Sequence, residues 1–230
     1  HFKQVFRVAE LLIFEGVGVS EHIVYGFMKS ADGGAISTRR GSGVSLAGVL
    51  DEAESRAARV IAKKNPELKD AGAISRMVGL GALKYFILAH DRVSDVTFRW
   101  DEALAFEGNT GPYLQYTHAR LKSILRKSEE PISTERVSDV ALDLLERQLA
   151  TAVLRFPEAI EDTLASWSPH VLAAYLYALA QSANGFYHAL PVLQEKDAAK
   201  KSLRLSLVFA AATTLRKGLF LLGIDAPDEM

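Results

Sequence analysis

Helical periodicity dominates the chain from Ser45 onward, and it is the feature that most constrains the fold. Apolar residues recur there at a spacing of three and four, and short connections containing Pro, Gly or Asn interrupt them. Amphipathic helices joined by short connections are typical of a helix bundle. The pattern predicts a helix through Asp51–Lys64 with Ser45 as its N-cap, and further helices at Ile74–His90, Pro112–Lys127, Val137–Phe156, Pro157–Ser166, Pro169–Ala189 and Asp197–Leu222.

The residues before Ser45 differ from this pattern. A helix is expected over residues 2–14, and residues 22–28 form a short β-branched and aromatic run. The Asp-Gly-Gly at 32–34 indicates a β-hairpin turn. A composition shift near residue 108 indicates a boundary between a mixed α/β portion, 1–107, and an all-helical portion, 108–230.

Composition excludes several classes of protein. The chain has 230 residues, 49% of them hydrophobic, which is enough for a real core. It has no cysteine, so disulfides and thiolate metal sites are excluded, and its histidines lack metal-ligand spacing, so no metal is predicted. Charged residues interrupt the apolar stretches, which argues against a membrane span. No signal peptide opens the chain, so a cytoplasmic location is expected, and His1 in place of Met suggests a fragment of a longer protein.

The charge is close to balanced, at −1, but it is unevenly distributed. Six cations stand between Lys196 and Lys217 against the single acid Asp197. Such a helix can contact phosphates, although an ordinary solvated helix face is the favoured interpretation.

Two further stretches carry more polar residues or glycine than packing requires. The first, "GGAISTRRGSG" at 33–43, offers backbone amides and paired arginines suited to phosphate, but it lacks the P-loop pattern, and a surface turn is favoured from spacing alone. The second, "EGNTGPYLQYTHAR" at 107–120, opens a helix. Its Asn109 and Thr110 can cap that helix.

Tyr113, Tyr116 and Arg120 are expected to share one face of this helix, because they are spaced i, i+3 and i+7. Such a face can stack on unpaired bases and hold phosphates. Tyrosines half-buried at a helix crossing are the equal alternative.

Three strings resemble those of arginyl-tRNA synthetases, which are class I enzymes: "VGLGALKYFIL" at 78–88, "FRWDEALAFEGNTGPYLQYTHAR" at 98–120 and "LLGIDAPDEM" at 221–230. The resemblance spans nearly the whole chain in order. It implies a mainly α-helical fold, in which the end of a Rossmann-like nucleotide-binding fold with a short β-hairpin precedes an α-helical anticodon-binding bundle. The lack of zinc-ligand spacing and the "EGNTGPYLQY" string argue against the cysteine enzyme, which shares such a bundle.

The resemblance also assigns the stretch "AISTRRGSG". It corresponds to the KMSKS loop of the family, with Ser37, Thr38 and Arg39 as catalytic residues that, together with Gly41, bind the phosphates of ATP. Ala35 stands where a lysine often occurs, so arginine must supply the cations. The family's HIGH motif and most of its arginine pocket would lie upstream of His1, so this chain is not expected to activate arginine by itself.

The resemblance implies an arginine–tRNA ligase whose partners are ATP with Mg²⁺, L-arginine and an arginine tRNA. The enzyme is expected to be a monomer that does not bind membranes. A non-catalytic tRNA-binding module derived from a synthetase is the alternative. Predicted tRNA contacts are Asn109, Tyr113, Gln115, Tyr116, Arg120, Arg216 and Met230.

Overall fold

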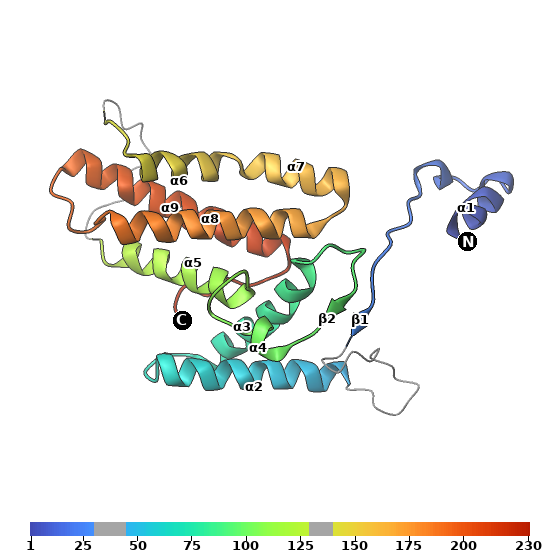
Figure 1. Ribbon diagram of the computed structural model, residues 1–230, viewed down its shortest axis with the longest axis horizontal. Coiled ribbons are helices and arrows are strands. Elements are labelled where there is room, and N and C mark those ends of the chain that lie inside the picture. Colours follow the sequence, from blue (N-terminus) through green and yellow to red (C-terminus); the bar gives the residue numbers. More distant parts are fainter. Residues whose placement is uncertain (30–44, 129–139) are drawn as a thin grey trace.

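The computed structural model describes residues 1–29, 45–128 and 140–230. The described chain is mostly helical, with one pair of very short strands (Figure 1). Helix α1 (Phe2–Leu11) and the 3-10 turn η1 (Val17–Val19) lie apart from the rest, at the end of an extended segment. The other helices form two packed groups, a lower pair and an upper bundle.

The lower pair is α2 (Leu46–Lys64) and α3 (Ala71–Leu88). The predicted cap of α2 is confirmed, because the Ser45 hydroxyl accepts a hydrogen bond from the Gly48 amide at 3.0 Å. The helix stops at Asn65, as the following Pro66 requires. A short helix, α4 (Trp100–Ala103), leads from this pair toward the bundle.

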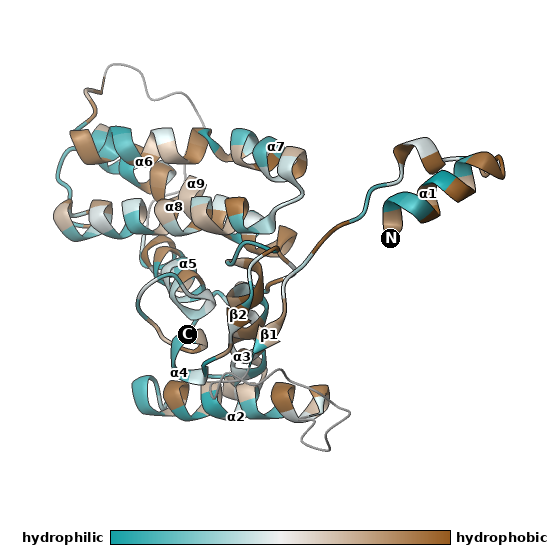
Figure 2. Cartoon of the chain, turned by 45° about the vertical axis from the view of Figure 1, so that its right-hand side comes forward, coloured by the Kyte–Doolittle hydropathy of each residue, from teal (hydrophilic) through white to brown (hydrophobic). Residues whose placement is uncertain are grey.

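The upper bundle contains α5 (Gly111–Arg126), α6 (Leu144–Leu154), α7 (Phe156–Ser166), α8 (Pro169–Ala189) and α9 (Ala198–Leu221). These helices agree with the predicted ones except at the start of α6, which begins at Leu144 rather than Val137. There Asp143 and Glu146 form a reciprocal capping box that sets the helix start. Apolar faces of the helices turn toward one another (Figure 2), and the core between them is rich in leucine and alanine.

The strands pair differently from a hairpin. Strand β1 (Met28–Lys29) pairs in parallel with β2 (Val96–Thr97), far along the sequence. The Asp95 carboxylate accepts from the Phe27 amide at 2.8 Å and lies 2.8 Å from the Lys29 ammonium, which fixes the register. The predicted hairpin turn at 32–34 lies outside the described residues.

Helix α3 is long and apolar enough to cross a membrane by length and composition. In this structure, however, it packs between α2 and α5, and eight of its residues are buried: Ser75, Val78, Gly79, Gly81, Ala82, Leu83, Tyr85 and Phe86. Its hydropathy therefore reflects a core position in the fold.

The basic stretch around α9 is partly internal, which corrects its interpretation as a solvated face. Arg204 is only 3% exposed, and its Nε lies 2.7 Å from the fully buried Glu146 carboxylate. Its other nitrogens lie 2.7 Å from Glu195 and 3.3 Å from Asp143. A buried charge pair that lost one partner would leave the other uncompensated, so this network fixes α6, α9 and the connection before α9 together.

Two glycines of α3 allow unusually close helix contacts. A Cβ at Gly79 would lie 2.7 Å from the backbone of Ala53 in α2, and one at Gly81 would lie 2.5 Å from the Gln115 amide in α5. Both distances are shorter than van der Waals contact. Only glycine therefore lets α3 pack this closely on both neighbours.

We expect Gly79→Ala to lower the free energy of unfolding by about 1–3 kcal/mol, because overpacking moves α2 away from α3. Gly72→Ala is the matched control, since it lies in the same helix with no atom within 4 Å of the added Cβ. Helix propensity alone should stabilise that variant by about 0.5–1 kcal/mol. Urea denaturation measures both, and equal effects of the two substitutions would contradict the close-packing argument.

Candidate nucleic-acid interface

The turn before α5 fixes where this helix starts. Gly108 has φ of +79°, in the region that favours glycine, and Pro112 stands in the first turn. The Thr110 hydroxyl accepts from the Tyr113 amide at 3.2 Å and donates to the Ala105 carbonyl at 2.6 Å. Thr110 is thus the N-cap, as predicted, whereas the Asn109 side chain accepts from the Tyr85 hydroxyl at 2.6 Å.

The inward face of α5 is polar as well as apolar. Gln115 and Thr117 are fully buried, and His118 is 1% exposed. The Gln115 amide donates to the Met77 carbonyl at 3.1 Å and to the Asp225 carbonyl at 2.7 Å. His118 Nδ1 lies 3.1 Å from the Pro227 carbonyl. These side chains therefore hold neighbouring backbone, and they do not face solvent.

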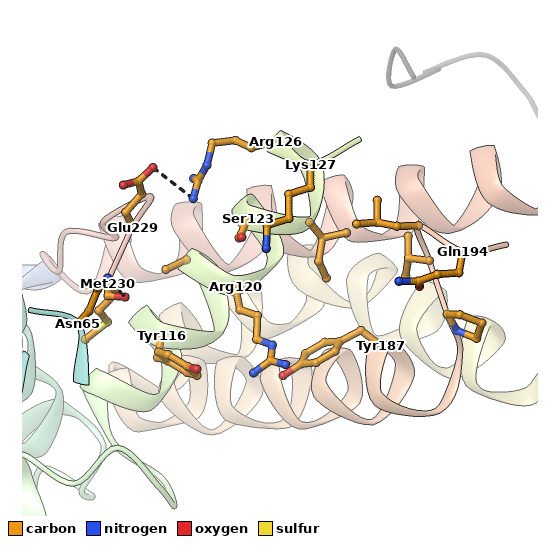
Figure 3. A pocket seen from close by; sticks show the side chains of 15 residues that line it. Asn65, Tyr116, Arg120, Ser123, Arg126, Lys127, Tyr187, Gln194, Glu229 and Met230 are labelled. Atoms are coloured by element: carbon orange, nitrogen blue, oxygen red, sulfur yellow. Dashed lines mark hydrogen bonds and ion pairs between the residues drawn. The ribbon is translucent and has the colours of Figure 1, made fainter. Parts of the chain in front are cut away.

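The outward face of α5 forms one side of an open groove of about 580 Å³. Figure 3 shows Tyr116 and Arg120 projecting from α5, with the Arg120 guanidinium beside the ring of Tyr187 from α8. The remaining lining residues come from the ends of α2 and α5, the connection after α8 and the C-terminus: Asn65, Ala119, Ser123, Ile124, Arg126, Lys127, Pro191, Val192, Leu193, Gln194, Glu229 and Met230.

Cations and aromatic rings are paired in this groove and in the adjoining pocket, which Lys64 lines. The Arg120 guanidinium lies 4.7 Å from the centre of the Tyr187 ring, and Lys64 Nζ lies 5.9 Å from that of Tyr116. Arg126 forms an ion pair with Glu229 at 3.4 Å. Arg120 has no acidic partner among the described residues. An exposed guanidinium beside tyrosine rings can hold a phosphate while a ring stacks on a base.

Burial raises the pKa of the Tyr187 phenol, whereas the nearby Arg120 guanidinium acts in the opposite direction. The phenol therefore stays protonated at neutral pH, and its hydroxyl can donate a hydrogen bond to a ligand in the groove.

The structure brings together three of the predicted tRNA contacts, Tyr116, Arg120 and Met230, in this groove. Tyr116 is 37% exposed, so part of its ring is accessible. Arg216 lines a separate pocket of about 550 Å³ with Met77 and Phe220.

Three other predicted contacts lie away from this groove, two of them at least partly buried and Asn109 exposed. Tyr113 is partly buried, and its hydroxyl accepts from the Asn184 amide at 2.7 Å. Asn109 lines a third pocket, beside Tyr85. The structure does not place Gln115 on an exposed face, because its side chain is fully buried. The polar character of Gln115 in the sequence did not reveal that its amide donates to main-chain carbonyls inside the fold.

Sequence reasoning missed Lys64, which lines the pocket adjoining the groove, and the groove residues Asn65, Arg126, Lys127 and Tyr187. The first two end α2, more than 50 positions before Tyr116, and no local pattern connects them to it. Lys127 follows Arg120 at i+7, a same-face helical spacing that would have been a usable signal.

The predicted phosphate-binding residues Ser37, Thr38, Arg39 and Gly41 lie outside the described residues. Over the parts of the chain that are described, no group of three or more His, Asp or Glu side chains is arranged to hold a metal ion.

Comparison with protein families identifies two regions. The model of the DALR anticodon binding domain matches residues 114–230, and that of the tRNA synthetases class I (R), catalytic domain, matches residues 1–100. The two models together leave residues 101–113 unmatched, which include most of α4, the turn before α5 and the first residues of α5.

Whole-chain comparisons agree with this. The chain is 42% identical to an arginine–tRNA ligase of Saccharophagus degradans and 40% identical to one of Chromobacterium violaceum, each over 100% of this chain and 40% of that protein. The Thermus thermophilus arginyl-tRNA synthetase structure superposes with a TM-score of 0.84 at 39% identity, over 93% of this chain and 36% of that one. The arginyl-tRNA synthetase structure of Plasmodium falciparum superposes with a TM-score of 0.80 at 27% identity, over 100% of this chain and 39% of that one. The chain thus spans about 40% of these relatives' length.

Burial of His118 predicts a pH dependence of stability. Burial lowers the pKa of this imidazole below its ordinary 6.5, and the Pro227 carbonyl only partly opposes the shift. The unfolded chain therefore binds a proton that the folded chain does not as pH falls below 6.5. Stability contributed by neutral His118 is present above that pH and is lost below it.

Unfolding free energies measured between pH 7.5 and 5 should fall more steeply in the natural chain than in His118→Asn. Asparagine keeps a donor for the Pro227 carbonyl but does not titrate. An NMR titration of His118 in the folded chain that gave a pKa at or above the ordinary value would contradict this account.

Proposed function

Because the chain belongs to the arginyl-tRNA synthetase family, we propose that its helical bundle binds the anticodon stem and loop of an arginine tRNA through the groove on α5. The observation that carries this proposal is the convergence of Tyr116, Arg120 and Tyr187 on one open groove. The DALR family match over residues 114–230 supports the same assignment.

The groove suits an unpaired loop better than a duplex. Exposed aromatic rings stack on bases only where the bases are splayed out, as they are in a loop. Arg120 and Lys127 can meet the phosphates on either side of such a base, although the chain as a whole is almost neutral. A concave site with rings inside and cations at its rim therefore selects looped RNA over helical RNA.

We further propose that residues 108–230 form the anticodon-binding unit and that residues 1–107 complete a catalytic domain. In the catalytic domain, the phosphates of ATP with its Mg²⁺ would be bound by Ser37, Thr38, Arg39 and Gly41. Adenylate formation builds negative charge at the α-phosphate, which cations and backbone amides stabilise. The complete enzyme would join L-arginine to its tRNA at the expense of ATP, in the cytoplasm and as a monomer.

Replacing Tyr116 with alanine should weaken binding of an arginine tRNA transcript by about 1–3 kcal/mol, since a stacked base would lose its platform. Binding is measured by titration at fixed salt, because phosphate contacts alone make affinity depend on salt.

Phe209→Ala is the matched control, because Phe209 is a similarly exposed ring, at 40%, on α9 and outside the groove. The control should bind like the natural chain. An unchanged affinity for a folded Tyr116→Ala variant, or an equal loss in both variants, would remove Tyr116 from the interface.

A further inference from the structure

The last residues of the chain form a strap, residues 223–230, that crosses α5 and ends in the groove. Side chains from other helices donate to five of its main-chain carbonyls. Lys84 of α3 donates to Gly223, and Asn65 after α2 donates to Met230 at 3.5 Å. The other three donors lie on α5: Gln115 to Asp225 at 2.7 Å, His118 to Pro227 at 3.1 Å and Arg126 to Asp228 at 2.8 Å.

This pattern is unlike that of a strand or a helix. From Asp225 onward, no backbone-to-backbone hydrogen bond holds the strap within the described parts of the chain. Side chains take over that role, and the apolar contacts come from Ile224, which is 2% exposed, from Ala226 and from Met230, which packs against the smaller core beside α2. The position of the strap therefore depends on these apolar contacts and on side-chain donors from α2, α3 and α5.

Gln115 is the most constrained of these donors. Its side chain is fully buried, and its single NH₂ group serves both the strap and the Met77 carbonyl of α3. Its Oε1 has no hydrogen-bond partner among the described residues. The amide is thus oriented by the two carbonyls it donates to, and it lies so close to Gly81 that a Cβ there would be 2.5 Å from its nitrogen.

Arg126 and Lys84 differ from Gln115, because both are exposed. Water can replace either of them at the strap carbonyls. Gln115 and His118 are the two buried donors, at 0% and 1% exposure. Because water cannot readily take the place of a buried donor, loss of Gln115 is harder to compensate than loss of Arg126 or Lys84.

We infer that Gln115 is a positioning residue that holds the strap against α5, so that Met230 forms a wall of the tRNA groove. Met230 lines this groove and also the adjoining pocket of about 430 Å³ beside Lys64, Phe106 and Tyr116. The inference rests on the proposed function, since it concerns how the same groove is built. Gln115 itself does not touch the RNA.

The test begins with the strap alone. Gln115→Met keeps the length of the side chain and removes both donors. Digestion with a carboxypeptidase, followed by mass spectrometry, should release Met230 about tenfold faster from this variant, because one buried anchor is lost. Gln148→Met, an exposed position on α6, is the control and should release it at the natural rate. An unchanged rate in folded Gln115→Met would overturn the proposal.

Titration with the arginine tRNA transcript then asks whether Gln115 acts through the strap. Gln115→Met should weaken binding about tenfold in the full chain, but less than about twofold in a chain ending at Pro227, where Met230 is already missing. The same loss in both backgrounds would show that Gln115 acts elsewhere and would contradict the inference.

The two measurements separate this inference from the proposed function. If the natural chain showed no affinity for the tRNA, the proposed function would fail, whereas the release of Met230 would still decide whether Gln115 holds the strap. If Tyr116→Ala weakened binding but removal of residues 228–230 did not, the groove would stand without Met230 as its wall, and the inference would fail.

Discussion

Close contact of α3 with both α2 and α5 is the constraint on which the rest of the structure depends. Gly79 lets the backbone of Ala53 approach, and Gly81 lets Gln115 of α5 approach from the other side. A wider spacing would move the end of α2, with Lys64, away from Tyr116 and would separate the groove from its lower rim. The groove is therefore a product of helix packing between the two groups of helices.

The density of polar residues at the start of α5 has two physical causes. Half of them turn inward, where Gln115 and His118 bind main-chain carbonyls of the strap that have no backbone partner in the described parts of the chain. The others turn outward, where the Tyr116 ring faces the Lys64 ammonium and the Arg120 guanidinium faces the Tyr187 ring. A buried polar side chain must be hydrogen-bonded, and an exposed one is free for a ligand, so burial separates the two roles.

The helices could be predicted from sequence because their signals are local. The cap at Ser45, the stop at Pro66 and the bounds of α8 depend on residues next to one another. The parallel pairing of Met28 with Val96, the burial of Arg204 and the placement of Lys64 beside Tyr116 depend on contacts far along the chain. No periodicity in the sequence encodes such contacts. The resemblance of "EGNTGPYLQY" to a known family pointed to the proposed interface, but it did not separate the exposed residues Tyr116 and Arg120 from the buried Gln115.

The central claim is that the groove on α5 reads the anticodon loop and does not merely attract RNA. Its most direct test is a titration of this chain, at one fixed salt concentration, with an arginine tRNA transcript and with the same transcript carrying an altered anticodon. Base readout predicts that the altered transcript binds more weakly by about 1–3 kcal/mol, whereas phosphate contacts are the same in both. Equal affinity for the two transcripts would contradict the account and would leave the groove as a site that binds RNA without reading its sequence.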